Sequence, residues 1–318
     1  MDRLLHAIFP AQASNMAAPV DNIFFALLIL CGLVAFLVTA VALFFCIRYR
    51  RGSKADRTPS GKSPTKIEIT WTLIPMLIFL GLFFWAADVF FAMSRPPAGA
   101  TEIYVVGKQW MWKIQHPDGR REINELHLPI GQPVKLIMTS QDVIHDFFIP
   151  DFRTKQDVVP GRYTTEWFTP TRPGKYHLFC SQYCGTDHSR MIGWVYVMEP
   201  AEHAKWLASQ PAPDSLFALG ERAFRYRGCS GCHAPNAALR APLLEGIYGR
   251  QVPLADSTLV RADEQYLRDS VLLPNKQIAA GYEAIMPTFQ GQISDEELNE
   301  IIAYLKSLGD RPSTEEAR

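Results

Sequence analysis

The stretch 180-CSQYCGTDHSRM-191 places two thiols, an imidazole and a thioether within twelve consecutive residues. Copper prefers such soft donors, and a His/Cys set with a weak Met is typical of electron-transfer copper sites. Cys180 and Cys184 supply one thiolate more than a mononuclear blue-copper site uses, so the surplus thiolate could bridge a second copper. A two-copper site would need one imidazole more than this stretch supplies. His145, upstream in DVIHDFFIP, is the candidate to supply it.

The composition excludes some classes of protein. Lys+Arg and Asp+Glu number 32 each, so the net charge gives no indication of a nucleic-acid partner. The six cysteines do not read as a disulfide framework, because two of their three pairs have ligand or cofactor-attachment spacing. The pairs are Cys31 and Cys46, Cys180 and Cys184, and Cys229 and Cys232.

Two apolar runs near the N-terminus predict a membrane anchor. Residues 23–47 and 69–93 each exceed the ~20 residues that a helix needs to cross a lipid bilayer. The loop 48–68 between them is rich in Arg and Lys, which predicts that it is cytoplasmic. The tail, residues 1–22, and everything after the second span then face the opposite side, the periplasm in a bacterium.

Residues 100–200 change to period-two alternation with Pro and Gly turns between the runs. Many short strands at this spacing predict a β-sandwich or barrel. The copper-type stretch is then expected on a loop between the last two strands, and His145 on an earlier loop. Six strands are expected, at Glu102–Val106, Lys113–Gln115, Val134–Thr139, Thr164–Phe168, Lys175–Phe179 and Ile192–Met198.

A short helix and a proline-rich linker, residues 201–213, separate this unit from a second one at 214–310. Cys229 and Cys232 are spaced for thioether bonds to haem, and His233 follows at once as an iron ligand. Met286 is the only Met after Met198, so it is the available second axial ligand. The charged residues 311–318 are expected to form a disordered tail.

A closing helix is predicted by its capping signal and its apolar stripe. Ser294 and Glu297 have the spacing of a capping box. We expect the stripe to pack on a helix at residues 216–226, with Gly220 and Phe224 at the contact. The stripe consists of Leu298, Ile301, Ile302, Leu305 and Leu308.

The order of these features resembles subunit II of a haem-copper cytochrome c oxidase of the bacterial caa type, with a fused cytochrome c. The resemblance covers residues 20 to 310. It implies two transmembrane helices, a cupredoxin-like Greek-key β-sandwich and an all-α class I cytochrome c domain. By the same resemblance the sandwich binds dinuclear copper A and the last domain binds one covalent haem c. The implied copper ligands are His145, Cys180, the Gln182 carbonyl, Cys184, His188 and Met191.

The resemblance assigns roles to further positions. Trp110 corresponds to the aromatic residue through which electrons enter copper A, and Glu68 to a carboxylate at the mouth of a proton pathway. Lys155 and Asp157 belong to a loop facing subunit I. Pro242 corresponds to the proline beside the proximal His, and its carbonyl is expected to orient His233.

Two positions depart from the family pattern. Gln182 stands where the family often has a Glu that also binds magnesium or manganese, and a neutral amide is a weaker ligand for such hard cations. An interface metal is therefore not expected. Met111 stands where many members have Tyr, while Trp110 and Trp112 remain.

The function implied by the resemblance is electron entry into a respiratory oxidase in the bacterial plasma membrane. Cytochrome c or a membrane-bound cytochrome would be the donor. Subunit I, with haem a, haem a3 and copper B, would reduce oxygen and pump protons, with subunit III as a further partner. A nitric-oxide reductase subunit is the main alternative, and a membrane-anchored copper carrier or assembly protein the second. Cys180 and Cys184 exclude a quinol oxidase subunit, which lacks them.

Overall fold

The computed structural model describes residues 9–58, 65–209, 214–233 and 241–309. They form two compact units, one a helical pair within residues 15–95 and the other made of the described residues up to Ser14 and from Pro96 onward. The expected linker at 210–213 and the tail at 311–318 lie outside the described residues.

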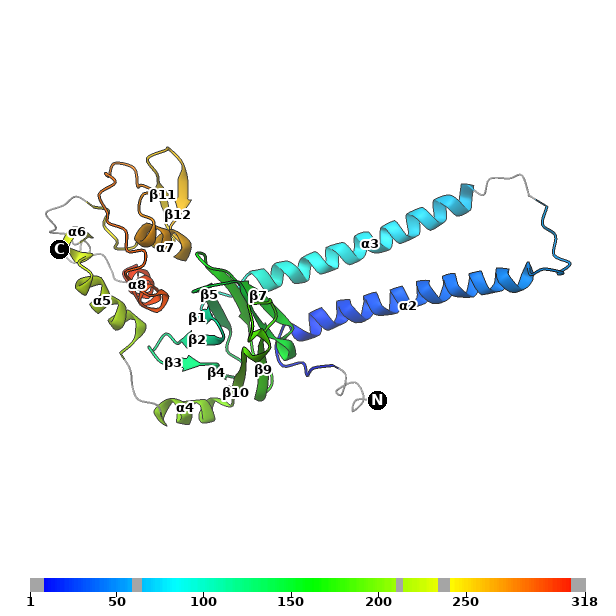
Figure 1. Cartoon of the computed structure of the whole chain (residues 1–318), viewed down its shortest axis with the longest axis horizontal. Helices are drawn as coiled ribbons and strands as arrows, with labels where there is room; N and C mark the ends of the chain where they lie inside the picture. Colours follow the sequence, from blue (N-terminus) through cyan, green and yellow to red (C-terminus); the bar gives the residue numbers. More distant parts are fainter. Residues whose placement is uncertain (1–8, 59–64, 210–213, 234–240, 310–318) are drawn as a thin grey trace. The chain divides into compact units, whose positions relative to one another are not determined.

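The helical pair consists of α2 (Ala17–Arg48) and α3 (Thr65–Ser94), which lie side by side in Figure 1. Their 32 and 30 residues exceed the length needed to cross a bilayer, and their apolar side chains are exposed. Both helices extend beyond the apolar runs at 23–47 and 69–93. Pro19 lies in the first turn of α2, where a missing backbone N–H costs no intrahelical hydrogen bond, so the helix begins ahead of the apolar run.

Two five-stranded sheets form the sandwich, in the orders β3-β2-β1-β5-β8 and β4-β10-β9-β6-β7. The pairs β1–β5 and β4–β10 are parallel, and the other pairs are antiparallel. The strands are β1 (Thr101–Lys108), β2 (Met111–Gln115), β3 (Arg121–Ile123), β4 (Glu125–Pro129), β5 (Val134–Ser140), β6 (His145–Ile149), β7 (Thr154–Val158), β8 (Thr164–Phe168), β9 (Gly174–Cys180) and β10 (Ile192–Met198).

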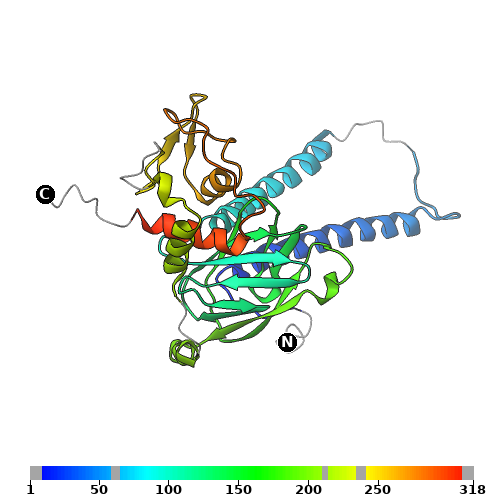
Figure 2. The same ribbon diagram turned by 60° about the vertical axis from the view of Figure 1, so that its left-hand side comes forward.

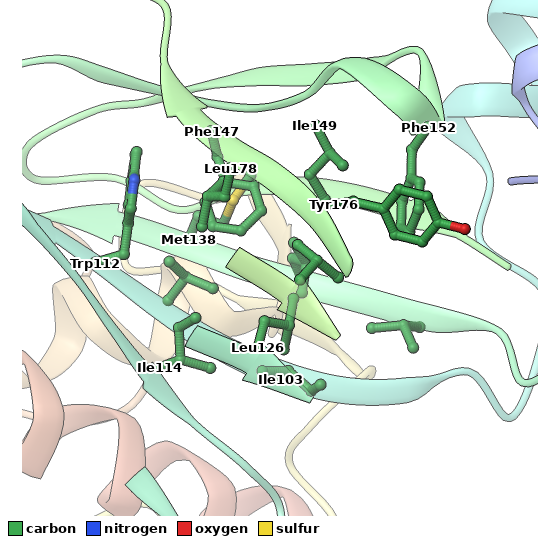
Figure 3. Close-up of a cluster of buried hydrophobic side chains, with 14 of the residues drawn as sticks. Ile103, Trp112, Ile114, Leu126, Met138, Phe147, Ile149, Phe152, Tyr176 and Leu178 are labelled. Carbon is green, nitrogen blue, oxygen red and sulfur yellow. The ribbon is translucent and has the colours of Figure 1, made fainter. Parts of the chain in front are cut away.

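Alternate side chains from both sheets fill the space between them (Figure 3). Trp112 of β2 is fully buried and meets Phe147 of β6 edge-on, with ring centroids 5.0 Å apart. Phe152 likewise meets Phe168 at 4.9 Å. This packed core holds the strand ends that carry the copper-type stretch.

All six expected strands are present, and β3, β4, β6 and β7 are additional. His145 begins strand β6, so its expected place on a loop is wrong. Lys155 and Asp157 lie in β7 and not in a loop. Sequence alternation missed β6 because its apolar residues are consecutive, and β7 because two of the residues on its inner face, Thr154 and Gln156, are polar.

The short helix α4 (Pro200–Ser209) follows the sandwich as expected. The C-terminal domain contains α5 (Leu216–Tyr226), α6 (Ser230–His233), α7 (Glu264–Leu272) and α8 (Asp295–Ser307). It also contains a small sheet of β11 (Gln251–Pro253) and β12 (Leu259–Arg261), so the domain is mainly rather than entirely helical.

Helices α5 and α8 cross at Gly220, as the sequence predicts (Figure 2). A Cβ atom there would lie 1.9 Å from the Glu300 carbonyl oxygen, so only glycine permits this approach. The Ser294 hydroxyl caps α8 by accepting the Glu297 N–H at 3.2 Å. In a complete capping box the Glu297 carboxylate would accept the Ser294 N–H. Here it instead accepts two hydrogen bonds of 2.7 Å from Arg227.

Candidate metal and haem sites

Paired strands bring the ends of the copper-type site together. Cys180 ends β9 and pairs with Phe147 of β6, the strand that His145 begins. The chain then loops through Cys184 and His188 and returns into β10 after Met191. Cys180, Cys184 and Met191 are buried, and His145 is completely buried.

The donor atoms that the sequence singled out converge in this loop. The Cys180 and Cys184 sulfurs lie 3.7 Å apart. Each thiol has its own imidazole, with His145 Nδ1 3.9 Å from the Cys180 Sγ and His188 Nδ1 3.5 Å from the Cys184 Sγ. Met191 Sδ lies 3.9 Å from the Cys184 Sγ.

The remaining donor is a backbone carbonyl. The Gln182 oxygen lies 3.2 Å from the Cys180 Sγ, while the residue itself is exposed. The structure therefore places the carbonyl, and not the amide side chain, within the donor set. Two thiols with two imidazoles, one thioether and one carbonyl suit two soft cations that share the thiolates.

Asp142 orients the His145 ring, a role that the sequence reading missed. Its Oδ1 lies 2.8 Å from His145 Nε2, which leaves Nδ1 directed at Cys180. A carboxylate behind a ligating imidazole selects its tautomer and raises its basicity. The sequence did offer one signal for this role, because Asp142 precedes the candidate ligand His145 by three positions.

The two thiols differ in acidity. Burial acts to raise the pKa of Cys180, but His145 and nearby backbone groups bring it down to about 7. Burial and the neighbouring Cys180 raise the pKa of Cys184 to about 12. One thiol of the pair therefore loses its proton readily, and bound cations would favour ionisation of both.

Trp110 lies against the same loop. It is half-buried, and its indole N–H donates to the Cys184 carbonyl at 3.3 Å. The Gln109 side-chain amide donates to the same oxygen at 2.9 Å. The indole ring is therefore held beside the candidate ligand Cys184. The contact of Gln109 with the same carbonyl was not predicted from the sequence.

The C-terminal domain contains a cavity of about 390 Å³. Its lining is mainly apolar and includes Cys229, Cys232, His233, Met286, Phe224 and Pro242. The thiols, the imidazole and the thioether that the sequence singled out therefore face one cavity. This lining fits a covalently attached haem with His and Met as axial ligands.

His233 is oriented as the resemblance implied. Its Nδ1 lies 2.8 Å from the Pro242 carbonyl oxygen, so Nδ1–H donates and Nε2 remains free to ligate. Glu68 lies separately, in the first turn of α3 among exposed residues.

Three family models match the chain in sequence order. "Cytochrome C oxidase subunit II, transmembrane domain" matches residues 4–88, and "Cytochrome C oxidase subunit II, periplasmic domain" matches residues 121–197. "Cytochrome c" matches residues 217–309.

Named relatives support the same assignment. The chain is 32% identical over 274 residues to cytochrome c oxidase subunit 2 of Thermostichus vulcanus, covering 66% of this chain and 83% of the relative. It is 28% identical over 306 residues to the same subunit of Alkalihalophilus pseudofirmus, covering 91% and 86%. The solved periplasmic domain of subunit II (CoxB) of Bradyrhizobium japonicum is 30% identical, with a TM-score of 0.35, covering 36% of this chain and 96% of that one. The chain therefore belongs to the cytochrome c oxidase subunit II family, as a membrane-anchored member that carries a C-terminal cytochrome c domain.

Proposed function

We propose that this chain is the electron-entry subunit of a terminal oxidase. It would accept electrons at a haem c, relay them through dinuclear copper A and deliver them to haem a of subunit I, where oxygen is reduced with proton pumping. The observation that carries the proposal is the paired donor set, in which two thiols 3.7 Å apart each have an imidazole within 4 Å. Two redox groups in one chain supply stepwise one-electron transfer when bound.

The copper residues are held by a rigid scaffold. His145, Cys180, Cys184, His188 and Met191 would hold the metal pair, with the Gln182 carbonyl as the sixth donor. β6 and β9 are hydrogen-bonded to each other beneath them, and Asp142 fixes one imidazole. Little reorganisation is then needed when charge changes, which favours fast electron transfer. Trp110, bonded to the loop, would be the entry point for electrons.

The haem residues divide their tasks. Cys229 and Cys232 would form the thioether attachment, and His233 and Met286 the axial pair. Pro242 holds the imidazole by its carbonyl. With His233 and Met286 as ligands the haem would have a raised reduction potential, which would let it accept electrons from a cytochrome donor.

The membrane arrangement follows from chain order. Residues 11–14 precede α2 and contact the sandwich: the Ala11 N–H donates to Asp151, the Ala13 N–H to the Asp151 carbonyl, and Ser14 pairs with Pro170. The chain on both outer sides of the helical pair thus belongs to one unit. With a basic connection between the helices, we propose that this unit lies in the periplasm.

Other partners are proposed from the family role. They are subunit I, subunit III and a cytochrome donor, with Glu68 at the mouth of a proton pathway. We do not propose an interface magnesium or manganese ion, because the Gln182 amide is a weak ligand for such hard cations.

Optical and EPR spectra of the purified full-length chain test the proposal. A low-spin c-type haem and the seven-line signal of mixed-valence copper A are expected. Cys184→Ser should abolish the seven-line signal, whereas Cys31→Ser in α2 should leave it intact. A four-line mononuclear signal in the unaltered chain would refute dinuclear copper, and labile single copper without haem would indicate a copper carrier. Oxygen and nitric oxide consumption by the purified complex separates the two reductases.

A further inference from the structure

The C-terminal haem domain, residues 214–309, packs on the outer face of the sheet β3-β2-β1-β5-β8 (Figure 2). Tyr104 of β1 and Ile137 of β5 are buried on that face together with Leu216 of α5. Strand β1 is consequently buried on both faces over most of its length. Contact between the two domains is therefore a specific packed interface.

Charged side chains surround this apolar centre and pair across it. Lys113 Nζ lies 2.6 Å from Glu296 and Lys135 Nζ 3.4 Å from Glu264. Arg121 pairs with Glu300, and Lys306 pairs with Glu102 across the interface. We name this set the ionic lock: Glu102, Lys113, Arg121 and Lys135 of the sandwich with Glu264, Glu296, Glu300 and Lys306 of the haem domain.

The ionic lock is more than a set of independent surface pairs. Lys306 also lies 2.9 Å from Glu264, and Lys135 lies 3.1 Å from Glu102, so four charges form one closed network. The side chains of Lys306, Glu264 and Lys135 retain only 15%, 12% and 18% of their exposure. Networks of half-buried charges hold more firmly than isolated pairs, and added salt still weakens them.

The lock and the haem cavity occupy opposite faces of α8. Successive residues of an α-helix turn by about 100°. Glu296, Glu300 and Lys306 therefore project to one side of α8, as do Asn299 and Ala303. Ile301 and Leu305, which line the haem cavity, project to the opposite side.

In helix α7 the division runs along the helix, with its first residues at the sandwich and the following turns at the cavity. Glu264 and Gln265 at its start contact the sandwich: Gln265 Oε1 accepts the Tyr163 N–H at 2.7 Å. Tyr266, Leu267 and Val271 line the cavity. The body of α8, an α-helix about 10 Å across, thus stands between the cavity and the sheet.

The copper-type loop takes no part in this interface. Among the described residues, 180–191 make no hydrogen bond or ion pair with the haem domain. One polar contact of the interface joins Gln141 of the sandwich to Glu296 of α8 at 3.4 Å. Electron tunnelling slows steeply with distance, so a haem held behind α8, without a polar contact between its domain and the loop, would be poorly placed to deliver electrons to that loop.

We infer that the ionic lock holds the haem domain in a loading position, with its haem cavity turned away from the sandwich, and that delivery to copper A requires release of the lock. This inference rests on the proposed function. It deepens that function by adding a salt-sensitive conformational step between the two redox sites.

A charge swap tests the lock in the full-length chain. Lys113→Glu places like charges opposite each other, and Glu296→Lys in the same chain restores an opposite pair. The rate of haem-to-copper electron transfer is followed after flash reduction of the haem. Lys113→Glu should raise this rate by about five-fold and weaken its dependence on salt, and the double variant should return both to the original values. Haem and copper spectra check that each variant is folded and loaded.

A second readout does not depend on the redox groups. Carbodiimide joins a lysine amine to a carboxylate that it contacts, and peptide mass spectrometry should find Lys306 joined to Glu102. This cross-link should decrease in Lys113→Glu and recover in the swap.

Three results would overturn the lock. They are absence of the cross-link in the unaltered chain, an unchanged rate in Lys113→Glu, and a slower rate in Lys113→Glu that the swap restores. The last would make the docked position the delivering one. Failure of the proposed function is distinct, because missing haem or copper spectra leave the cross-link result intact.

Discussion

Replacing the buried Glu166 by leucine should stabilise the sandwich at neutral pH. Glu166 lies on β8, on the same face as the core residue Phe168, and pairs with Leu136 of β5. It is only 7% exposed, and neither carboxylate oxygen has a hydrogen-bond partner among the described residues. A buried acid without partners is held at a cost to stability.

The cost can be worked from the pKa. Burial raises the pKa of Glu166 from 4.5 to about 8; the neighbouring Thr154 hydroxyl acts to lower it, but its geometry to the carboxylate is not that of a hydrogen bond. At pH 7 the folded state therefore keeps a proton that the unfolded state has lost. Holding it costs about 3 kcal/mol, since each pH unit above the ordinary pKa is worth about 1.4 kcal/mol.

The sign of the pH dependence follows from the same values. Between pH 4.5 and 8 the folded state binds more protons than the unfolded state, so the free energy of unfolding falls as pH rises. The advantage of Glu166→Leu should then be small near pH 5 and large near pH 8.

Hydrogen exchange measured by mass spectrometry can follow this in the full-length chain. Peptides from β5 and β8 report opening of the core, and at pH 7 their protection should rise on the order of 100-fold in Glu166→Leu. Glu125→Leu, which replaces an exposed acid on β4, is the matched control and should show no such gain. Equal protection in the Glu166 variant and the unaltered chain, or a gain independent of pH, would refute the reasoning.

Three further changes have defined outcomes. Gly220→Ala should destabilise the haem domain by about 1–3 kcal/mol, because the added methyl group would collide with the Glu300 carbonyl. Thermal unfolding followed by haem absorbance measures this change, and an unchanged midpoint would contradict the close approach of the two helices. Met286→Leu should lower the haem reduction potential in a redox titration by removing the thioether, and a constant potential would argue for another axial ligand. Asp142→Asn should weaken copper retention against a chelator by about 10–100-fold, because the carboxylate no longer orients His145; equal retention would show that packing alone holds the ring.

Strand prediction succeeded where polar and apolar residues alternate in the sequence itself, and failed where buried positions are polar or apolar residues are consecutive. β9 and β10 alternate between buried and more exposed residues and were located from the sequence. β7 is an edge strand with polar Thr154 and Gln156 on its inner face, and β6 begins with His145 and Asp146, a polar pair that resembles a loop. Alternation reports burial, so it says little about strands whose burial is set by distant neighbours.

The sequence by itself determined the features that lie close together along the chain. The donors of 180–191, the attachment spacing of Cys229 to His233 and the two apolar helices are each written within a short stretch, because local spacing sets which side chains can meet. The tertiary structure decided contacts between distant stretches. It placed Asp142 behind His145, buried Glu166 without a partner, and set the haem domain on the sandwich with its cavity on the far side of α8. These depend on how whole sheets and helices pack, which no local period records.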